Sequence, residues 1–302
     1  MPDPSGGSGI WSCWGVYGLQ AREAPLDANY RMELQYDGAG LYGWAKQDGL
    51  LTVEGCLEEA LRTVLGFAPK LRVAGRTDAG VHARRQVVSL ELPRQVDAAR
   101  LKGSLNALTP PGILVTRIGR VPAAFDARRD ALSRTYRYFL SAAPVVSPFW
   151  SRYCWQVGHD LDLELLVQAA QAVRGNHDFT AFTPAVTEHT HLRRTVRSCL
   201  WRRAYGVALG AMRTRPMGSG SARKTGSAVI CLEIVADSFL RHMVRALVGT
   251  MVEVAGGKRS LDSLVCLLEG AAREGAGLTA PAHGLFLWEI EYGTSRHGGP
   301  GD

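Results

Sequence analysis

The stretch RVAGRTDAGVHARRQVVSLEL, residues 72–92, sets the pattern on which the rest of the fold can be built. Its two ends predict short strands, at 71–74 and 87–92, because apolar and β-branched residues alternate there with polar ones. Between them, GRTDAGVHA places an arginine, an aspartate and a histidine among small residues. Gly75 and Gly80 permit backbone conformations that other residues avoid, so we expect a constrained loop.

Asp78 is the candidate catalytic group of this loop, with Arg76 and His82 close in sequence. An aspartate in such surroundings is ionised at neutral pH and can act as a nucleophile or a base. The alternative is an aspartate that caps its own turn, which is the commoner role of an arbitrary Thr-Asp pair. The rest of the sequence has to decide between these two interpretations.

Helices and strands follow in two similar rounds along the chain. The first round has strands near 30–36, 71–74, 87–92, 113–121 and 133–140, with helices at 53–65 and 98–108. Thr52 and Asp97 are suited to cap these helices, and Gly66 to end the first. The second round predicts helices at 163–173, 239–255 and 261–268, and strands at 193–203, 229–235 and 284–292. We infer an α+β fold of two similar halves, whose mainly antiparallel sheets form a central sheet flanked by helices.

The division into halves rests on SAAPVVSPFW, residues 141–150, which is rich in proline and small residues. We therefore expect halves at 30–140 and 141–295, a flexible N-terminal extension at 1–29 and a short tail at 296–302. Residues 206–228 contain four basic residues, no acidic ones, and many glycines and serines. They predict a flexible hairpin tip, with RNA contact as a secondary role.

Composition narrows the classes of partner and compartment. The chain of 302 residues has a formal net charge of +7 and a pI of about 9.3, which favours polyanionic partners. Its six cysteines form no CxxC pair and have no histidine at ligand spacing, which argues against zinc and against a disulfide framework. Reduced thiols point to the cytoplasm. No apolar run has the length of a membrane span, and the first thirty residues do not resemble a transit peptide.

SRTYRYFL, residues 133–140, places Arg134, Tyr136 and Tyr138 on one face of a strand, because side chains two apart point the same way. Tyrosines on a basic strand face can stack on a nucleobase. A half-buried aromatic face with no ligand is the alternative, and the segment alone does not separate the two.

DSFLRHMVRALVG, residues 237–249, has an apolar face beside Arg241 and Arg245, which lie four apart. An arginine next to a core face requires a carboxylate, and Asp78 is the candidate partner. The alternative, taken alone, is that both arginines are exposed to solvent.

Eight segments taken in order identify a family. YDGAGLYGW, VAGRTDAGVHA, LNAL, FDAR, SRTYRY, NHDFTAF, SFLRHMVR and PAHGLFL resemble the ordered motifs of the TruA family of tRNA pseudouridine synthases, from about residue 31 to 292. The resemblance implies a fold of the pseudouridine synthase type. It also implies an isomerase that converts uridine to pseudouridine at positions 38, 39 and 40 of the tRNA anticodon stem-loop.

The resemblance further assigns roles to single residues. Asp78 corresponds to the catalytic nucleophile and Tyr136 to the tyrosine that stacks on the target base. Arg245 corresponds to the arginine that pairs with the aspartate, and Arg76 to one that contacts RNA near the flipped base. Leu285 corresponds to a pocket-lining position. The family implies that neither a metal nor a cofactor is needed. It also implies a homodimer that holds tRNA across both subunits. His82 is then best interpreted as structural.

Two other classes of protein compete with this enzyme. A catalytically silent tRNA-binding module on the same fold would bind tightly but form no product, although such a protein has no need to keep Asp78, Tyr136 and Arg245 together. A carboxylate-based glycosidase requires a second acid near Asp78, and the loop offers only Arg76 and His82.

Overall fold

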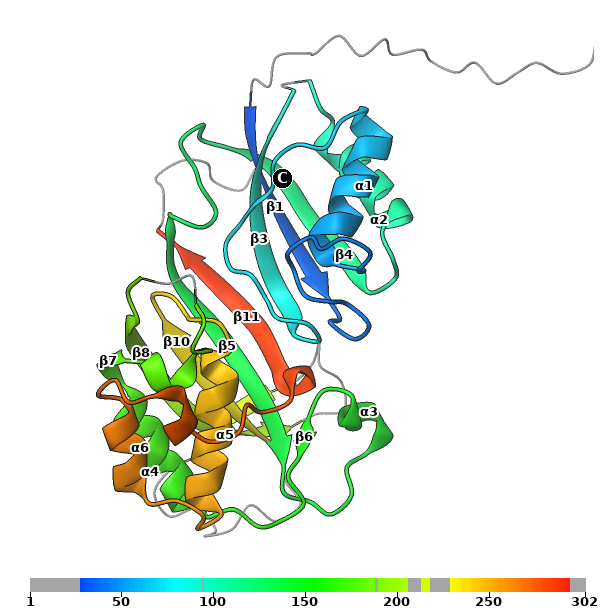
Figure 1. Ribbon diagram of the computed structural model, residues 1–302. Coiled ribbons are helices and arrows are strands. Elements are labelled where there is room, and N and C mark those ends of the chain that lie inside the picture. The colour runs from blue at the N-terminus through cyan, green and yellow to red at the C-terminus, as the bar shows by residue number, and fades with distance from the viewer. Residues whose placement is uncertain (1–27, 94, 188–189, 206–212, 218–228, 294–302) are drawn as a thin grey trace, which may run out of the picture.

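The computed structural model describes residues 28–93, 95–187, 190–205, 213–217 and 229–293 of the chain (Figure 1). Most of the predicted N-terminal extension and of the predicted hairpin tip, and the predicted tail at 296–302, lie outside the described residues. Within the predicted tip, residues 213–216 form a strand that pairs with residues 202–205. This part of the expected flexible hairpin is therefore ordinary sheet.

Eleven strands form a single sheet in the described part of the chain. Their bounds are β1 Ala28–Tyr36, β2 Arg72–Val73, β3 His82–Leu92, β4 Ile113–Val121, β5 Ala131–Ser141, β6 Trp155–Gln156, β7 Gly175–Asp178, β8 Arg193–Tyr205, β9 Arg213–Pro216, β10 Val229–Ala236 and β11 Leu285–Tyr292. The main path runs β4-β1-β3-β11-β5-β10-β8-β7, and β2, β6 and β9 pair with β3, β5 and β8. All described pairs are antiparallel except β3 with β11 and β5 with β6.

Helices cover this sheet in two groups (Figure 1). Their bounds are α1 Val53–Leu65, α2 Ala98–Leu108, α3 Pro148–Ser151, α4 Leu163–Val173, α5 Met243–Ala255 and α6 Leu261–Leu267, with short 3-10 turns at Thr180–Phe182, Arg273–Gly275 and Ala282–Gly284. The α1–α2 pair packs beside β4, and α4, α5 and α6 pack together beside β5 and β8. The predicted α+β fold, with a mainly antiparallel central sheet flanked by helices, is confirmed.

The predicted ends of the first two helices are also confirmed. The Thr52 hydroxyl accepts a hydrogen bond from the Gly55 N–H, and the Asp97 carboxylate accepts from two N–H groups at the start of α2. These side chains satisfy N–H groups that have no partner inside the helix. Gly66 ends α1 in the left-handed conformation, with φ of 81°.

The predicted start of the long helix at Phe239 is wrong, because α5 begins at Met243. The apolar periodicity does continue through Phe239 and Leu240, but the backbone does not. His242 has φ of 63°, the left-handed region, which a residue inside a right-handed helix cannot adopt. The helix therefore starts one residue after it.

The last strand joins the two parts of the sheet. β11 pairs in parallel with β3, through Phe286 with His82, and antiparallel with β5. Alternate β11 side chains reach opposite faces, so Leu285 and Leu287 enter the main core while Phe286 and Trp288 pack on the other face. Because β5 pairs with both β10 and β11, the sheet crosses the proposed boundary after residue 140 without a break. The division into halves stays a prediction.

Candidate active site

The loop that carries Asp78 connects β2 to β3 and is fixed by the preceding loop of the chain. Trp44 donates its backbone N–H to the Thr77 carbonyl over 3.0 Å, and Gly80 donates to the Leu41 carbonyl over 3.1 Å. The Thr77 hydroxyl lies 2.8 Å from the hydroxyl of Tyr36 at the end of β1. The segment YDGAGLYGW thus acts as a frame for GRTDAG.

Two glycines allow this close fit. A Cβ atom on Gly43 would lie 2.7 Å from the Thr77 carbonyl oxygen, which is too close for any other residue. Gly80 has φ of 76°, a conformation that L side chains rarely adopt. Gln86 on β3 closes the other side of the loop by donating its amide N–H to the Gly75 carbonyl over 2.8 Å. The expected constrained loop is confirmed.

The Asp78 carboxylate points across to α5. Its Oδ2 atom accepts a hydrogen bond from Arg245 Nη1 over 3.3 Å, and the side chains are 22% and 16% exposed. Among the described residues no group hydrogen-bonds Oδ1, and no N–H of the loop caps the carboxylate. The aspartate is therefore partly exposed to solvent and does not close its own turn.

Arg245 is held in its orientation by the chain that precedes β11. Its Nε–H donates to the Ala280 carbonyl over 2.8 Å, and the Ala280 N–H donates back to the Arg245 carbonyl over 3.1 Å. This pair of bonds leaves the end of the guanidinium for Asp78. Arg241, which we expected on a neighbouring helical stripe, precedes α5 and is exposed.

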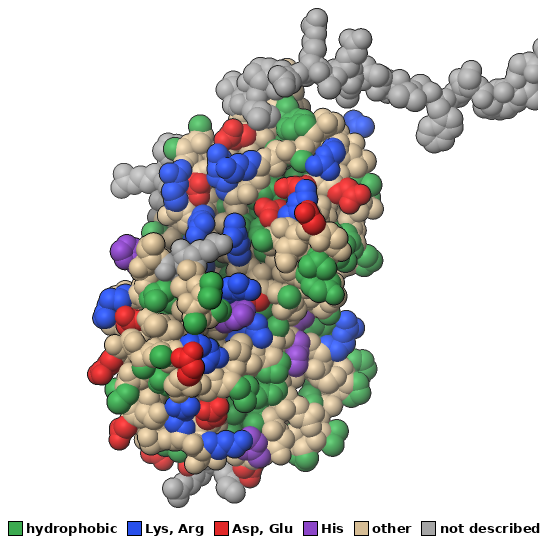
Figure 2. Space-filling model, viewed as in Figure 1, with side chains coloured by type: hydrophobic (Ala, Val, Ile, Leu, Met, Phe, Trp, Pro, Cys, Tyr) green, Lys and Arg blue, Asp and Glu red, His purple; other side chains and the backbone are tan. Residues whose placement is uncertain are grey.

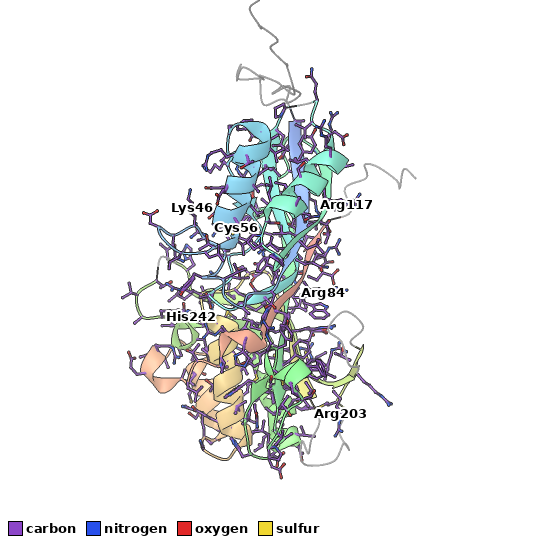
Figure 3. The ribbon with its side chains drawn as sticks, turned by 90° about the vertical axis from the view of Figure 1, so that its right-hand side faces the viewer. Lys46, Cys56, Arg84, Arg117, Arg203 and His242 are labelled. Atoms are coloured by element: carbon purple, nitrogen blue, oxygen red, sulfur yellow. The ribbon has the colours of Figure 1, made fainter. Side chains whose placement is uncertain are left out.

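His242 is a further site residue, which is not among those expected from the sequence. Its Nε2 atom lies 3.6 Å from the same Oδ2 of Asp78, which is ion-pair distance and longer than a hydrogen bond. Figure 3 shows it between the upper and lower helices, on the side of the sheet away from Arg84 and Arg203. Its position three residues before Arg245 in SFLRHMVR was the available signal, since such pairs share a face.

Tyr136 lies on the same side of the sheet, close to the loop. A Cβ atom on Gly75 would be 4.0 Å from the Tyr136 hydroxyl, and the Tyr136 ring packs edge-on against Phe239 at a centroid distance of 4.9 Å. Burial, together with the negative charges near it, raises the pKa of Tyr136, so the phenol stays neutral. Tyr136, Asp78 and Arg245 therefore lie in one region of the structure.

For the other two predicted site residues, Arg76 and Leu285, the described structure gives no hydrogen bond or ion pair with the Asp78 carboxylate. Arg76 is exposed at the mouth of the loop. Leu285 is buried at the start of β11 and pairs in the sheet with Tyr138, whose hydroxyl donates to the Pro281 carbonyl over 2.9 Å. Tyr138 thereby fixes the segment before Leu285. The roles of Arg76 and Leu285 stay predictions.

His82 belongs to a different cluster. It is 1% exposed, with Nδ1 2.9 Å from Asp37 Oδ1 and its ring stacked on Phe286 at 4.5 Å. Nε2 lies 3.1 Å from the His283 carbonyl, and burial lowers the pKa of the imidazole. These contacts support a structural role for His82.

The surface around the site is basic. Figure 2 shows the face that carries the helices, where Lys and Arg side chains gather across the middle, between the two helical groups. Arg76 and Arg241 are among the exposed arginines. Positive charge in that place attracts a polyanion toward Asp78.

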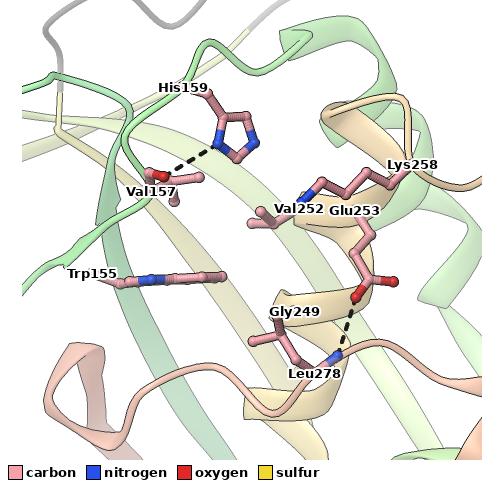
Figure 4. Close-up of a pocket in the computed structure, with 8 residues that line it drawn as sticks. All are labelled: Trp155, Val157, His159, Gly249, Val252, Glu253, Lys258 and Leu278. Carbon is pink, nitrogen blue, oxygen red and sulfur yellow. Dashed lines mark hydrogen bonds between the residues drawn. The ribbon is translucent and has the colours of Figure 1, made fainter.

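A separate hollow lies near the far end of α5 (Figure 4). It has a volume of about 250 Å³ and is lined by Trp155, Val157, His159, Gly249, Val252, Glu253, Lys258 and Leu278. Its Glu253 carboxylate is already used by the Leu278 N–H and by Arg259. Neither Asp78 nor Arg245 lines it, so it is not part of the candidate site.

The site combines one carboxylate, a guanidinium bonded to it, and an aromatic ring. Within the described residues no group of three or more His, Cys, Asp or Glu side chains is arranged to hold a metal ion. The five described cysteines are unpaired. No described helix is both long and apolar enough to cross a membrane.

Comparison with known proteins supports one assignment for such a site. Residues 169–293 match a family model described as tRNA pseudouridine synthase. The chain is 36% identical over 263 residues to tRNA pseudouridine synthase A of Chlorobium chlorochromatii (strain CaD3), covering 87% of this chain and 98% of the relative. The protein of the same name from Bifidobacterium animalis subsp. lactis (strain AD011) is 38% identical over 286 residues, with 87% and 92% covered. That of Brevibacillus brevis is 37% identical over 262 residues, with 87% and 98% covered.

Proposed function

The chain belongs to the tRNA pseudouridine synthase A (TruA) family, a family of isomerases, and on this basis we propose that it converts uridine to pseudouridine at positions 38, 39 and 40 of the tRNA anticodon stem-loop. The observation that carries the proposal is the pair formed by Asp78 and Arg245. These residues are 167 positions apart in sequence, yet their side chains meet within 3.3 Å at the basic middle of the molecule.

The target nucleotide must leave the stem before it can react, because a stacked and paired uridine does not expose its glycosidic bond. Extruding a base costs a few kcal/mol. Tyr136 offsets part of this cost by stacking on the base, for which its neutral and tightly packed ring is suited. Arg76, exposed beside Asp78, contacts the RNA near the flipped nucleotide.

Asp78 is the catalytic group that breaks the glycosidic bond, as a nucleophile in two of the courses below and as a base in the third. Arg245 holds Oδ2, which leaves Oδ1 directed at the substrate. Three courses are open to the carboxylate: attack on the sugar, attack on the ring, or removal of a sugar proton to give a glycal. In each course the uracil rotates in the pocket and rejoins the sugar through its C5 atom, which then loses its proton while N1 gains one, so that the product is an isomer of uridine. The reaction requires no external group, metal or cofactor. Leu285 lines the pocket in which the uracil rotates.

We extend the proposal to the assembly and its compartment. The protein acts as a homodimer whose basic surface holds tRNA across both subunits, which the net charge of +7 supports. The buried, unpaired cysteines Cys154, Cys199 and Cys231 suit a reducing compartment, and we place the activity in the cytoplasm.

The proposal is tested by incubating the protein with an unmodified tRNA transcript that has uridine at all three positions. Carbodiimide-dependent primer extension should then show new stops at positions 38, 39 and 40. Transcripts with cytidine at one of these positions serve as matched controls, and each should lose a single stop. Salt-dependent tRNA binding without any stop would instead identify a silent binding module.

A further inference from the structure

His242 has a backbone conformation that demands an explanation. It is the only described residue other than glycine with positive φ. A left-handed backbone is unfavourable for a residue with a Cβ atom, and such strain persists where the surrounding structure imposes it, often at functional sites. Here the conformation ends the turn before α5 and directs the imidazole toward Asp78, with Nε2 3.6 Å from Oδ2.

The charged groups around His242 come from four segments, one of which is its own turn. Asp78 faces it from the β2–β3 loop, Arg245 from α5, Arg241 from its own turn, and Arg273 from the 3-10 turn at Arg273–Gly275. The N-terminus of α5 adds partial positive charge. Burial is the largest effect and lowers the pKa of the imidazole below its ordinary value of 6.5, and the three arginines act in the same direction, whereas Asp78 opposes them. The imidazole is therefore uncharged at neutral pH.

An uncharged imidazole can still serve the carboxylate. With its hydrogen on Nε2 it presents an N–H group 3.6 Å from the Oδ2 atom that Arg245 contacts at 3.3 Å, a distance at which the attraction is electrostatic. The Arg245 hydrogen bond and this weaker contact together restrict the rotation of the carboxyl group. The other oxygen, Oδ1, then faces the substrate. Its position affects the reaction rate, since a misplacement of about 1 Å can lower the rate by a factor of about 100.

We propose that His242 is a positioning residue for the reaction of Asp78: its neutral side chain and Arg245 together hold Oδ2, and protonation of His242 stops the reaction. A charged imidazolium would form a full ion pair with Oδ2 beside the guanidinium and withdraw electron density from the nucleophile. The inference rests on the proposed function, because it concerns the same carboxylate.

Two substitutions separate the side chain from the strained backbone. His242→Gly removes the imidazole and adopts positive φ freely, so its thermal midpoint should be unchanged or raised. His242→Asn also tolerates this backbone and keeps an amide donor, but it cannot take up a proton. His159→Asn is the matched control, because His159 lies near the opposite end of α5, beside Gly256 (Figure 4).

The measurement is the single-turnover rate of pseudouridine formation from pH 5 to 8, with tRNA affinity determined in parallel. For wild type and His159→Asn we expect a rate that falls on the acid side, with a midpoint below 6.5. His242→Gly should be about a hundredfold slower at pH 7.5 with unchanged affinity. His242→Asn should stay within about tenfold of wild type and lose the acid limb assigned to His242.

The contrary outcomes are distinct. A His242→Gly protein as fast as wild type, or a His242→Asn protein with the wild-type acid limb, overturns the inference and leaves the proposed function intact. A wild-type protein that forms no pseudouridine at any pH overturns the proposed function and this inference with it.

Discussion

Arg134 is the residue that ties the elements of the site together. It is 8% exposed, and its guanidinium donates to the carbonyls of Ala74 over 2.9 Å, Arg128 over 2.7 Å and Asp237 over 2.7 Å. Ala74 precedes the Asp78 loop, and Asp237 precedes the turn that leads to α5. One buried side chain thus fixes the two segments that bring Asp78 and Arg245 together.

We expect Arg134→Lys to destabilise the protein by at least about 2 kcal/mol, because an ammonium group cannot reach all of these carbonyls and leaves buried acceptors unpaired. The free energy of unfolding from urea titration measures the effect. Arg129→Lys is the control, since the Arg129 side chain is 79% exposed, and it should change stability by less than about 0.5 kcal/mol. Equal stability of the two variants would contradict the proposed role of Arg134 in fixing these segments.

For single residues, the sequence predicts correctly those features that local backbone geometry determines, such as the strand face on which a side chain lies. The two-residue period correctly places Arg134 and Tyr136 on one strand face. The partners of Arg134 could not be predicted, because Ala74 and Asp237 lie 60 and 103 positions away and are backbone groups with no sequence signature. His242 was missed for a related reason: positive φ is uncommon for any residue with a Cβ atom, so the sequence does not locate the turn that directs this side chain toward Asp78.

At the scale of elements, α5 depends on a close approach to the chain before β11. A Cβ atom on Gly249 would lie 1.8 Å from the Leu278 carbonyl oxygen. Two residues further along, Ala280 holds Arg245. The distance between α5 and this segment therefore sets the position of the guanidinium that meets Asp78.

Gly249→Ala should separate α5 from the 278–280 segment, at a cost of about 1–3 kcal/mol, and slow pseudouridine formation by displacing Arg245. Gly103→Ala is the matched control within α2, where an added Cβ meets nothing within 4 Å. It should stabilise the protein by about 0.5–1 kcal/mol and leave the rate unchanged. Thermal unfolding and single-turnover rates measure both effects, and a fully active, stable Gly249→Ala protein would refute the coupling.

Element boundaries were predictable where a capping side chain marks them. Thr52, Asp97 and Gly66 act through neighbours within a few residues, so sequence alone locates both ends of α1 and the start of α2. The start of α5 was misplaced because apolar spacing continues through Phe239 while the backbone turns at His242. Periodicity reports which side chains are buried, and it does not report the dihedral angles between them.

At the scale of the whole molecule, the sheet brings residues from opposite ends of the chain to one site. The sequence predicts the α+β class and a central sheet, because strand and helix patterns are local. It does not predict that β11 lies between β3 and β5, since this pairing joins Phe286 to His82, and no local pattern specifies partners at such separation. That insertion places Arg245, through Ala280, opposite the Asp78 loop.

All of these contacts position Asp78, which we propose as the nucleophile, and the substitution Asp78→Asn tests that role. Asparagine keeps the shape of the side chain and removes its charge. Asp97→Asn is the matched control, because asparagine caps α2 as well as aspartate does. Pseudouridine formation on an unmodified transcript, measured alongside tRNA affinity, should be abolished in Asp78→Asn with affinity retained, and unchanged in Asp97→Asn. Product from Asp78→Asn at the wild-type rate would contradict the claim.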